Sequence, residues 1–156
     1  MSTHDPLLDL LARLHDENVE YVLIGGQAVR LNGFVRATED IDLLVKATRI
    51  NGERIIRALG FLDSSKELDA RWFAPDESGT VDNIRVADDL LIDLLFAANG
   101  QTYESVQPYV REIELEGTSV RVLNIDGLLL TKTDYREKDV LDKQVLRRIK
   151  QSLGGK

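Results

Sequence analysis

Three aspartates interrupt apolar stretches of the chain. Asp40 and Asp42 flank Ile41, and Asp93 lies inside the apolar run 90–96. Residues i and i+2 of a strand share a face, so the first two carboxylates project together. Two adjacent carboxylates repel, and their pKa values rise unless a cation lies between them. If the strand of Asp93 lies beside theirs, three carboxylates converge and can hold two Mg²⁺ ions, the arrangement used for in-line attack on a phosphate.

Simpler alternatives exist for these acids. Asp40 and Asp42 can be two exposed acids on a sheet edge. Asp93 is costly to bury as a charge, but a strand-end acid can bond to an arginine or to backbone amides. Both interpretations stay open at this point.

A second pattern is Ile24-Gly25-Gly26, between a predicted strand and a predicted helix. Glycine lets backbone amides approach a ligand closely, and a helix N-terminus presents free N–H groups to anions such as phosphate. A Gly-Gly turn without a ligand is the plainer alternative.

In this order, the pieces resemble the nucleotidyltransferases of the DNA polymerase beta superfamily. Their pattern is hydrophobic-Gly-[Gly/Ser], then Asp-hydrophobic-[Asp/Glu]-hydrophobic, then a third acid in a later strand. The chain supplies Ile24-Gly25-Gly26, Asp40-Ile41-Asp42-Leu43 and Ile92-Asp93-Leu94.

Two further segments are similar to small bacterial members of this superfamily, which include abortive-infection toxins of toxin–antitoxin systems. Residues 36–42 read Arg-x-Thr-x-Asp-x-Asp. A late Lys-x(n)-Arg-x-Lys-Asp-x-x-Asp helix is matched by Lys132, Arg136, Lys138, Asp139 and Asp142. The resemblance covers residues 20–145.

The resemblance implies a nucleotide site and a metal site. The catalytic and Mg²⁺-binding residues would be Asp40, Asp42 and Asp93, the last of which would also help to deprotonate the attacking hydroxyl. An NTP substrate would bind at Gly25, Gly26, Arg36, Thr38, Lys132 and Arg136. Gly26 stands where other members carry serine, so no hydroxyl is available there for the phosphate.

The last four of these residues also have ordinary explanations. Lys132 and Arg136 are four apart on a predicted helix and share a face, either over the triphosphate or on a salt-bridged surface. Arg36 can touch phosphate or pair with a neighbouring acid. Thr38 can orient the first aspartate strand, although threonine is common in strands.

The surrounding elements predict an α/β or α+β fold, a mixed sheet flanked by helices and followed by C-terminal helices. A first helix begins at Pro6 and ends near Asn18. Strands are predicted at 20–24, 40–45, 71–74, 80–86 and 90–96, and a hairpin at 110–115 and 119–123. Helices are predicted at 27–31 and 50–59, and from 125 onward in two pieces. We expect one nucleotidyltransferase-like domain over residues 1–156, with its helical part at about 125–152.

Composition limits the functional classes. The chain has 156 residues and no cysteine, which excludes a thiolate zinc site and a cysteine nucleophile. Its formal net charge of −7 argues against gripping nucleic acid over the whole surface. No apolar run is long enough to cross a bilayer, and the N-terminal residues do not read as a signal peptide, so we expect a cytoplasmic protein without a membrane partner.

The expected activity is Mg²⁺-dependent transfer of NMP from NTP to an acceptor hydroxyl on RNA, tRNA or protein, with pyrophosphate released. The protein would be a toxin–antitoxin component with an antitoxin protein as partner. Two alternatives are a catalytically inactive nucleotidyltransferase-fold binding module and a small-molecule, antibiotic-type nucleotidyltransferase. No motif identifies the NTP, the acceptor or the oligomeric state.

Overall fold

The computed structural model describes residues 6–31, 40–75, 81–133 and 136–154. Its centre is a six-stranded mixed sheet with the strand order β3-β4-β2-β1-β6-β5. The strands are β1 (Tyr21–Ile24), β2 (Asp40–Val45), β3 (Ile84–Ala87), β4 (Leu91–Leu95), β5 (Val110–Leu115) and β6 (Thr118–Leu123). The pairs β2–β4 and β1–β6 are parallel, and the other three pairs are antiparallel.

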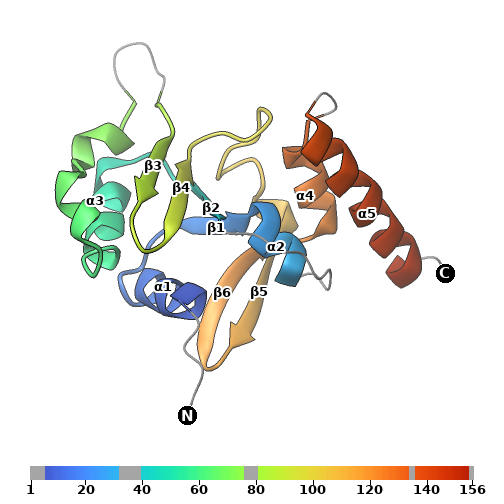
Figure 1. Cartoon of the computed structure of the whole chain (residues 1–156), viewed down its shortest axis with the longest axis horizontal. Coiled ribbons are helices and arrows are strands. Elements are labelled where there is room, and N and C mark those ends of the chain that lie inside the picture. Colours follow the sequence, from blue (N-terminus) through green and yellow to red (C-terminus); the bar gives the residue numbers. More distant parts are fainter. Residues whose placement is uncertain (1–5, 32–39, 76–80, 134–135, 155–156) are drawn as a thin grey trace.

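Helices flank this sheet and follow it, so the predicted α/β architecture is confirmed. They are α1 (Pro6–Asp16), α2 (Gly25–Leu31), α3 (Arg49–Ala58), α4 (Ile125–Thr131) and α5 (Glu137–Gly154), with short 3₁₀ helices η1 (Asp63–Glu67), η2 (Ala70–Phe73) and η3 (Gln107–Tyr109). Figure 1 shows α4 and α5 together on the opposite side of the central strands from α3. In the described part of the chain, no helix has the length and apolarity needed to span a membrane.

The leucines of α1 explain how it joins the core. Leu7, Leu10, Leu11 and Leu14 recur at helical spacing, and all four are buried. The helix packs against β6 and α3. It ends where Asn18 adopts a left-handed backbone conformation, φ 56°, as the position of that asparagine predicts.

A buried asparagine ties α3 to the two central strands. The Asn51 side chain accepts a hydrogen bond from Glu20 N at 2.8 Å and donates to Glu20 O and Lys46 O, both at 3.0 Å. These backbone groups lie just before β1 and just after β2. Glu20 O and Lys46 O also accept backbone hydrogen bonds, from Lys46 N at 3.2 Å and from Thr48 N at 3.1 Å. The amide therefore adds a side-chain tie between α3 and the strand ends remote from Asp42.

Two predicted strands differ from the structure. Residues 71–74 belong mainly to the 3₁₀ helix η2, and the strand predicted at 80–86 begins only at Ile84 among the described residues. Asp69 is the reason for the first difference. Its carboxylate accepts a hydrogen bond from Arg71 N at 2.9 Å and so caps a turn. Phe73 is buried, whereas Arg71 and Trp72 are exposed.

Candidate active site

Parallel pairing of β2 with β4 brings the predicted acids together. Asp42 lies directly opposite Asp93 in the register of the two strands, and Asp40 lies opposite Leu91. Ile41 and Leu43, which alternate with the two acids of β2, are buried. The expectation that the Asp93 strand neighbours the Asp40–Asp42 strand is therefore correct.

The strongest electrostatic perturbation in this cluster is at Asp42. Burial is the main cause, and the charge of Asp93, a hydrogen bond with Asp93 and the charge of Asp40 act in the same direction. Together they raise the pKa of Asp42 to about 6, although the charge of Lys132 opposes them. Negative charge at Asp42 is thus incompletely compensated, which is the condition that a bound cation relieves.

Arg85, to which no sequence pattern assigned a role, lies beside these acids. β3 pairs antiparallel with β4, and Arg85 is opposite Asp93. Its guanidinium lies 3.4 Å from Asp93 Oδ1 and 3.6 Å from Asp40 Oδ1. The plainer interpretation of Asp93, an acid bonded to an arginine, thus describes its contacts as they stand. Pairing the two adjacent predicted strands as a hairpin would have been the signal for this contact.

The donor chemistry suits a hard cation, but the side chains are not arranged around one. Within the ranges that the structure describes, no group of three or more His, Asp or Glu side chains is gathered closely enough to hold a metal ion. Three carboxylates with one raised pKa fit Mg²⁺ in ligand type and in charge. Binding would require the aspartate side chains to move toward a common centre.

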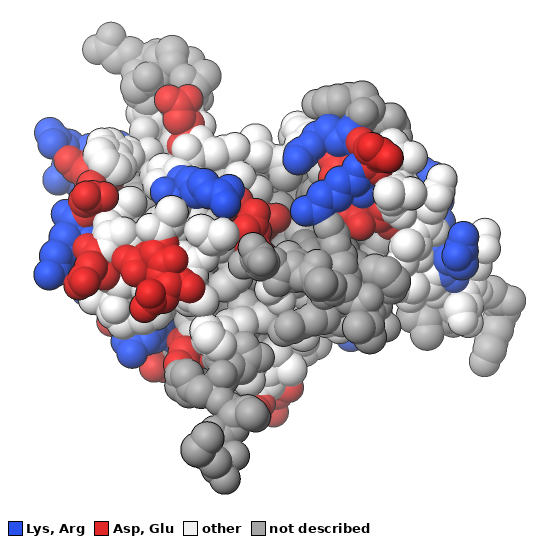
Figure 2. Space-filling view, viewed as in Figure 1, with Lys and Arg blue, Asp and Glu red and all other residues white. Residues whose placement is uncertain are grey.

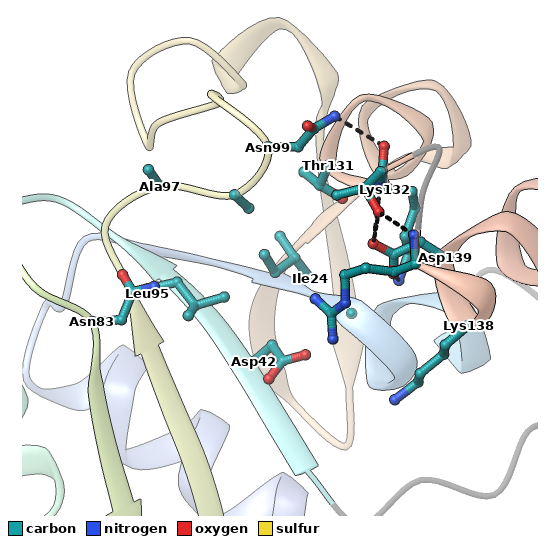
Figure 3. Close-up of a pocket in the computed structure, with 14 residues that line it drawn as sticks. Ile24, Asp42, Asn83, Leu95, Ala97, Asn99, Thr131, Lys132, Lys138 and Asp139 are labelled. Atoms are coloured by element: carbon teal, nitrogen blue, oxygen red, sulfur yellow. Dashed lines mark hydrogen bonds and ion pairs between the residues drawn. The ribbon is translucent and has the colours of Figure 1, made fainter.

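A cleft of about 280 Å³ opens above Asp42. It is lined by Ile24, Gly25, Asp42, Asn83, Leu95, Ala97, Ala98, Asn99, Thr131, Lys132, Thr133, Arg136, Lys138 and Asp139. Figure 3 shows Asp42 between one side that carries Asn83 and Leu95 and another that carries Lys132, Lys138 and Asp139. In Figure 2, lysine and arginine side chains gather over the first turns of α5. The cleft thus joins one carboxylate of the sheet to the cations of the C-terminal helices.

Gly25 forms the junction between the first strand and the cleft. It opens α2 with φ 71°, a conformation that other residues adopt with strain. A side chain there would also collide with Asp42, because a Cβ atom at position 25 would stand 3.0 Å from Asp42 Cβ and Cγ. Gly26 follows within α2. The glycine pattern therefore provides a close approach of backbone to carboxylate.

Lys132 and Arg136 both line the cleft, but not as neighbours on one helix face. The helix predicted through Lys132 is wrong, because α4 ends at Thr131 and α5 begins at Glu137. Lys132 is buried, with its Nζ 3.1 Å from Asp142 Oδ2 and 4.0 Å from Asp139 Oδ1. Its charge is already paired within the protein.

Asp139 explains why the helix is interrupted. It accepts hydrogen bonds from Thr133 N at 3.0 Å and from Thr133 Oγ1 at 2.9 Å. Burial alone would raise the pKa of Asp139, but these bonds and the charges of Lys132 and Arg136 outweigh it and lower the pKa. Lys132, Asp139 and Asp142 of the late segment therefore form, with Thr133, a buried polar anchor on the cleft wall.

The structure brings part of the predicted site together at the cleft. Gly25, Asp42, Lys132 and Arg136 line the cleft. Asp40 and Asp93 are not among its lining residues, although Asp93 adjoins Asp42. Arg36 and Thr38 lie outside the described residues.

Asn83 and Asn99 line the cleft as well, without having been predicted. Asn83 accepts a hydrogen bond from Phe96 N at 3.0 Å. Asn99 donates to Lys132 O at 2.9 Å. Both contacts join segments distant in the sequence, so no local pattern reveals them.

No protein-family model matches the chain, and no match is found among curated proteins.

Proposed function

We propose that this protein is a Mg²⁺-dependent nucleotidyltransferase, which transfers NMP from an NTP to an acceptor hydroxyl. The observation that carries the proposal is the register match of Asp42 with Asp93 beside a cleft whose far wall bears Arg136 and Lys138. Paired carboxylates on parallel strands opposite exposed cations are suited to a substrate that combines a phosphate chain with a divalent ion.

The metal site would be formed by Asp40, Asp42 and Asp93. Bound Mg²⁺ would neutralise phosphate charge and align the attacking and leaving oxygens. Arg136 and Lys138 are exposed at the start of α5 and would bind the negative charge that accumulates on the leaving pyrophosphate. Lys132 is paired with Asp142, so it would act through the electrostatic field of its ammonium group and by shaping the cleft wall.

The transfer step balances without a further reactant. The acceptor oxygen forms a bond to the α-phosphorus, and the bond from that phosphorus to the bridging oxygen of pyrophosphate breaks. The hydroxyl proton would pass to Asp93, which is partly exposed beside Asp42. Asp42 would stay ionised to hold the cation. Positioning and electrostatics would supply most of the rate.

The acceptor and the setting follow from the resemblance to small bacterial nucleotidyltransferases. We propose an RNA, tRNA or protein hydroxyl as acceptor, a cytoplasmic location and a role as a toxin that an antitoxin protein restrains. Arg136 and Lys138 are exposed near the start of α5 and suit a phosphate-bearing substrate, although acidic side chains lie among the cations there (Figure 2).

The direct test is transfer of label from α-phosphate-labelled NTPs, with Mg²⁺, into total RNA and total protein. Asp42→Asn and Asp93→Asn should each lower the rate by about 100-fold or more, since loss of even an outer partner of a metal ligand costs about 10- to 100-fold. Asp63→Asn is the matched control, because Asp63 is fully exposed and lies in η1. Transfer that persists in both site variants would refute the assignment.

One observation favours a second candidate, a binding module that has the fold without the chemistry. Arg85 already contacts two of the three acids, and the described side chains form no metal cluster. Such a module would transfer no label to RNA, protein or small hydroxyl compounds, and neither NTP nor Mg²⁺ would shift its melting temperature. Label that appears only on a small hydroxyl compound would instead identify an antibiotic-type enzyme.

A further inference from the structure

Arg85 bridges two acids of the cluster formed by Asp40, Asp42 and Asp93. Its Nη1 atom is 3.4 Å from both carboxylate oxygens of Asp93, and its Nη2 atom is 3.6 Å from Asp40 Oδ1. One guanidinium therefore takes the space between two carboxylates that lie on different strands. A cation bound by the same two carboxylates would need part of that space.

The strand that carries Arg85 lets its side chain leave. β3 is at the end of the strand order, so Arg85 belongs to an edge strand. Its side chain is 54% exposed, whereas the backbone is held by the pairing of Arg85 with Asp93. Withdrawal of the guanidinium into water would break no buried contact. The arrangement thus combines a fixed attachment point with a removable charge.

Repulsion between positive charges explains why Arg85 and a divalent ion would not contact the same carboxylate oxygens together. Fully ionised, the cluster carries three negative charges, and Arg85 offsets one of them. A divalent ion on Asp93 would contact its oxygens at about 2.0–2.1 Å if it were Mg²⁺. The guanidinium on the same oxygens would then face a doubly positive neighbour at close range, where repulsion is large.

We propose that Arg85 is a built-in counter-cation of this cluster, which competes with a divalent cation for Asp40 and Asp93. Without metal, it limits repulsion among the acids and keeps them on one face. When metal binds, the guanidinium withdraws to solvent. The inference rests on the proposed function, because it assigns Arg85 a role toward the metal that the transfer reaction would use.

The test is to titrate the full chain with Mn²⁺ in the absence of nucleotide. Binding is measured as the loss of the electron paramagnetic resonance signal of free Mn²⁺. Arg85→Gln should bind Mn²⁺ about three- to tenfold more tightly than the original chain, the range expected from one or two exposed ion pairs. Arg85→Lys, which keeps the charge, should stay closer to the original affinity. Arg57→Gln is the matched control: Arg57 is 56% exposed and pairs with Glu17 at 3.1 Å on a different element.

Each outcome separates the two proposals. Equal affinity in the original chain and Arg85→Gln, or weaker binding in Arg85→Gln, would overturn the competition while leaving the metal site intact. A gain of the same size in Arg57→Gln would also overturn it, since net charge alone would explain the result. Absence of Mn²⁺ binding in both the original chain and Arg85→Gln, each shown to be folded by circular dichroism, would overturn the competition and the proposed function together.

Discussion

Gly25 lies against Asp42 so closely that position 25 has no room for a side chain. A Cβ atom there would overlap Asp42 Oδ2 and stand 3.0 Å from two further Asp42 atoms. The backbone at Gly25 also has φ 71°. One glycine therefore satisfies two separate requirements, a left-handed backbone and the rotamer of the neighbouring carboxylate.

We predict that Gly25→Ala abolishes metal binding while Gly117→Ala does not. Gly117 also has a left-handed backbone, φ 83°, but an added Cβ would meet nothing within 4 Å. Both variants should lose about 1–2 kcal/mol of stability from backbone strain. Only Gly25→Ala should also displace Asp42, which Mn²⁺ titration would detect. Equal Mn²⁺ affinity in the two variants would show that the close approach is without consequence.

Ionisation of Asp42 should make the metal-free protein less stable as pH rises. The pKa of Asp42 is about 6 in the folded protein against 3.8 ordinarily, so between these values the folded state retains a proton that the unfolded chain has lost. Stability therefore falls as pH rises through this window. Asp42→Asn should raise the melting temperature at about pH 8 and leave it nearly unchanged below about pH 4.

Melting curves recorded in a chelating buffer would check this pH dependence. Asp63→Asn is the control, because its carboxylate is fully exposed. If Asp42→Asn lowered the melting temperature at both pH values, the ionised Asp42 carboxylate would be stabilising the fold rather than opposing it through burial and repulsion.

Loss of the Asn51 amide should destabilise the ends of both central strands. Asn51→Ala would leave Glu20 N, Glu20 O and Lys46 O without their side-chain partner. We expect a loss of about 2–4 kcal/mol in the free energy of unfolding, measured with urea. Thr48→Ala removes only the N-cap bond to Asn51 N and should cost about 1 kcal/mol. A similar cost for both variants would argue against this role of the amide.

Loss of the buried Lys132–Asp142 ion pair should lower the free energy of unfolding far more than loss of an exposed ion pair, even one whose charged atoms are closer together. Lys132→Met removes a buried cation that lies 3.1 Å from Asp142 and 4.0 Å from Asp139, and it should cost about 3–5 kcal/mol. Lys150 pairs with Asp126 at 2.6 Å, but both side chains are half exposed. Lys150→Met should therefore cost no more than about 1 kcal/mol. Urea denaturation of both variants gives the comparison, and equal losses would mean that Lys132 is not a structural residue.

Elements with strong local patterns could be predicted from the sequence. The strand at 40–45 matches β2, and the hairpin at 110–123 matches β5 and β6 within a residue. Alternation of acids with buried Ile41 and Leu43 is a property of the strand itself. The register that places Asp93 opposite Asp42 depends on sheet order, which could be stated only as a condition.

Contacts between distant segments, or polar bonds inside a turn, could not be predicted in this way. Arg85 meets Asp40 only because β2 and β3 flank the same strand. The break after Thr131 depends on Asp139 capturing Thr133, a side-chain contact that helical periodicity does not contain. In both cases the sequence shows the residue types, but it does not show which residues contact each other.

The charged residues of the cleft come from two separate parts of the sequence. Its carboxylate from the sheet, Asp42, is encoded in the first third, whereas Lys132, Arg136 and Lys138 are all encoded in the last fifth. During translation, every aspartate of the cluster leaves the ribosome before any of these cations. A nascent chain that has reached only β6 thus exposes acids without the wall that faces them. The complete cleft can therefore form only after the segment that holds Lys132, Arg136 and Lys138 has also been synthesised.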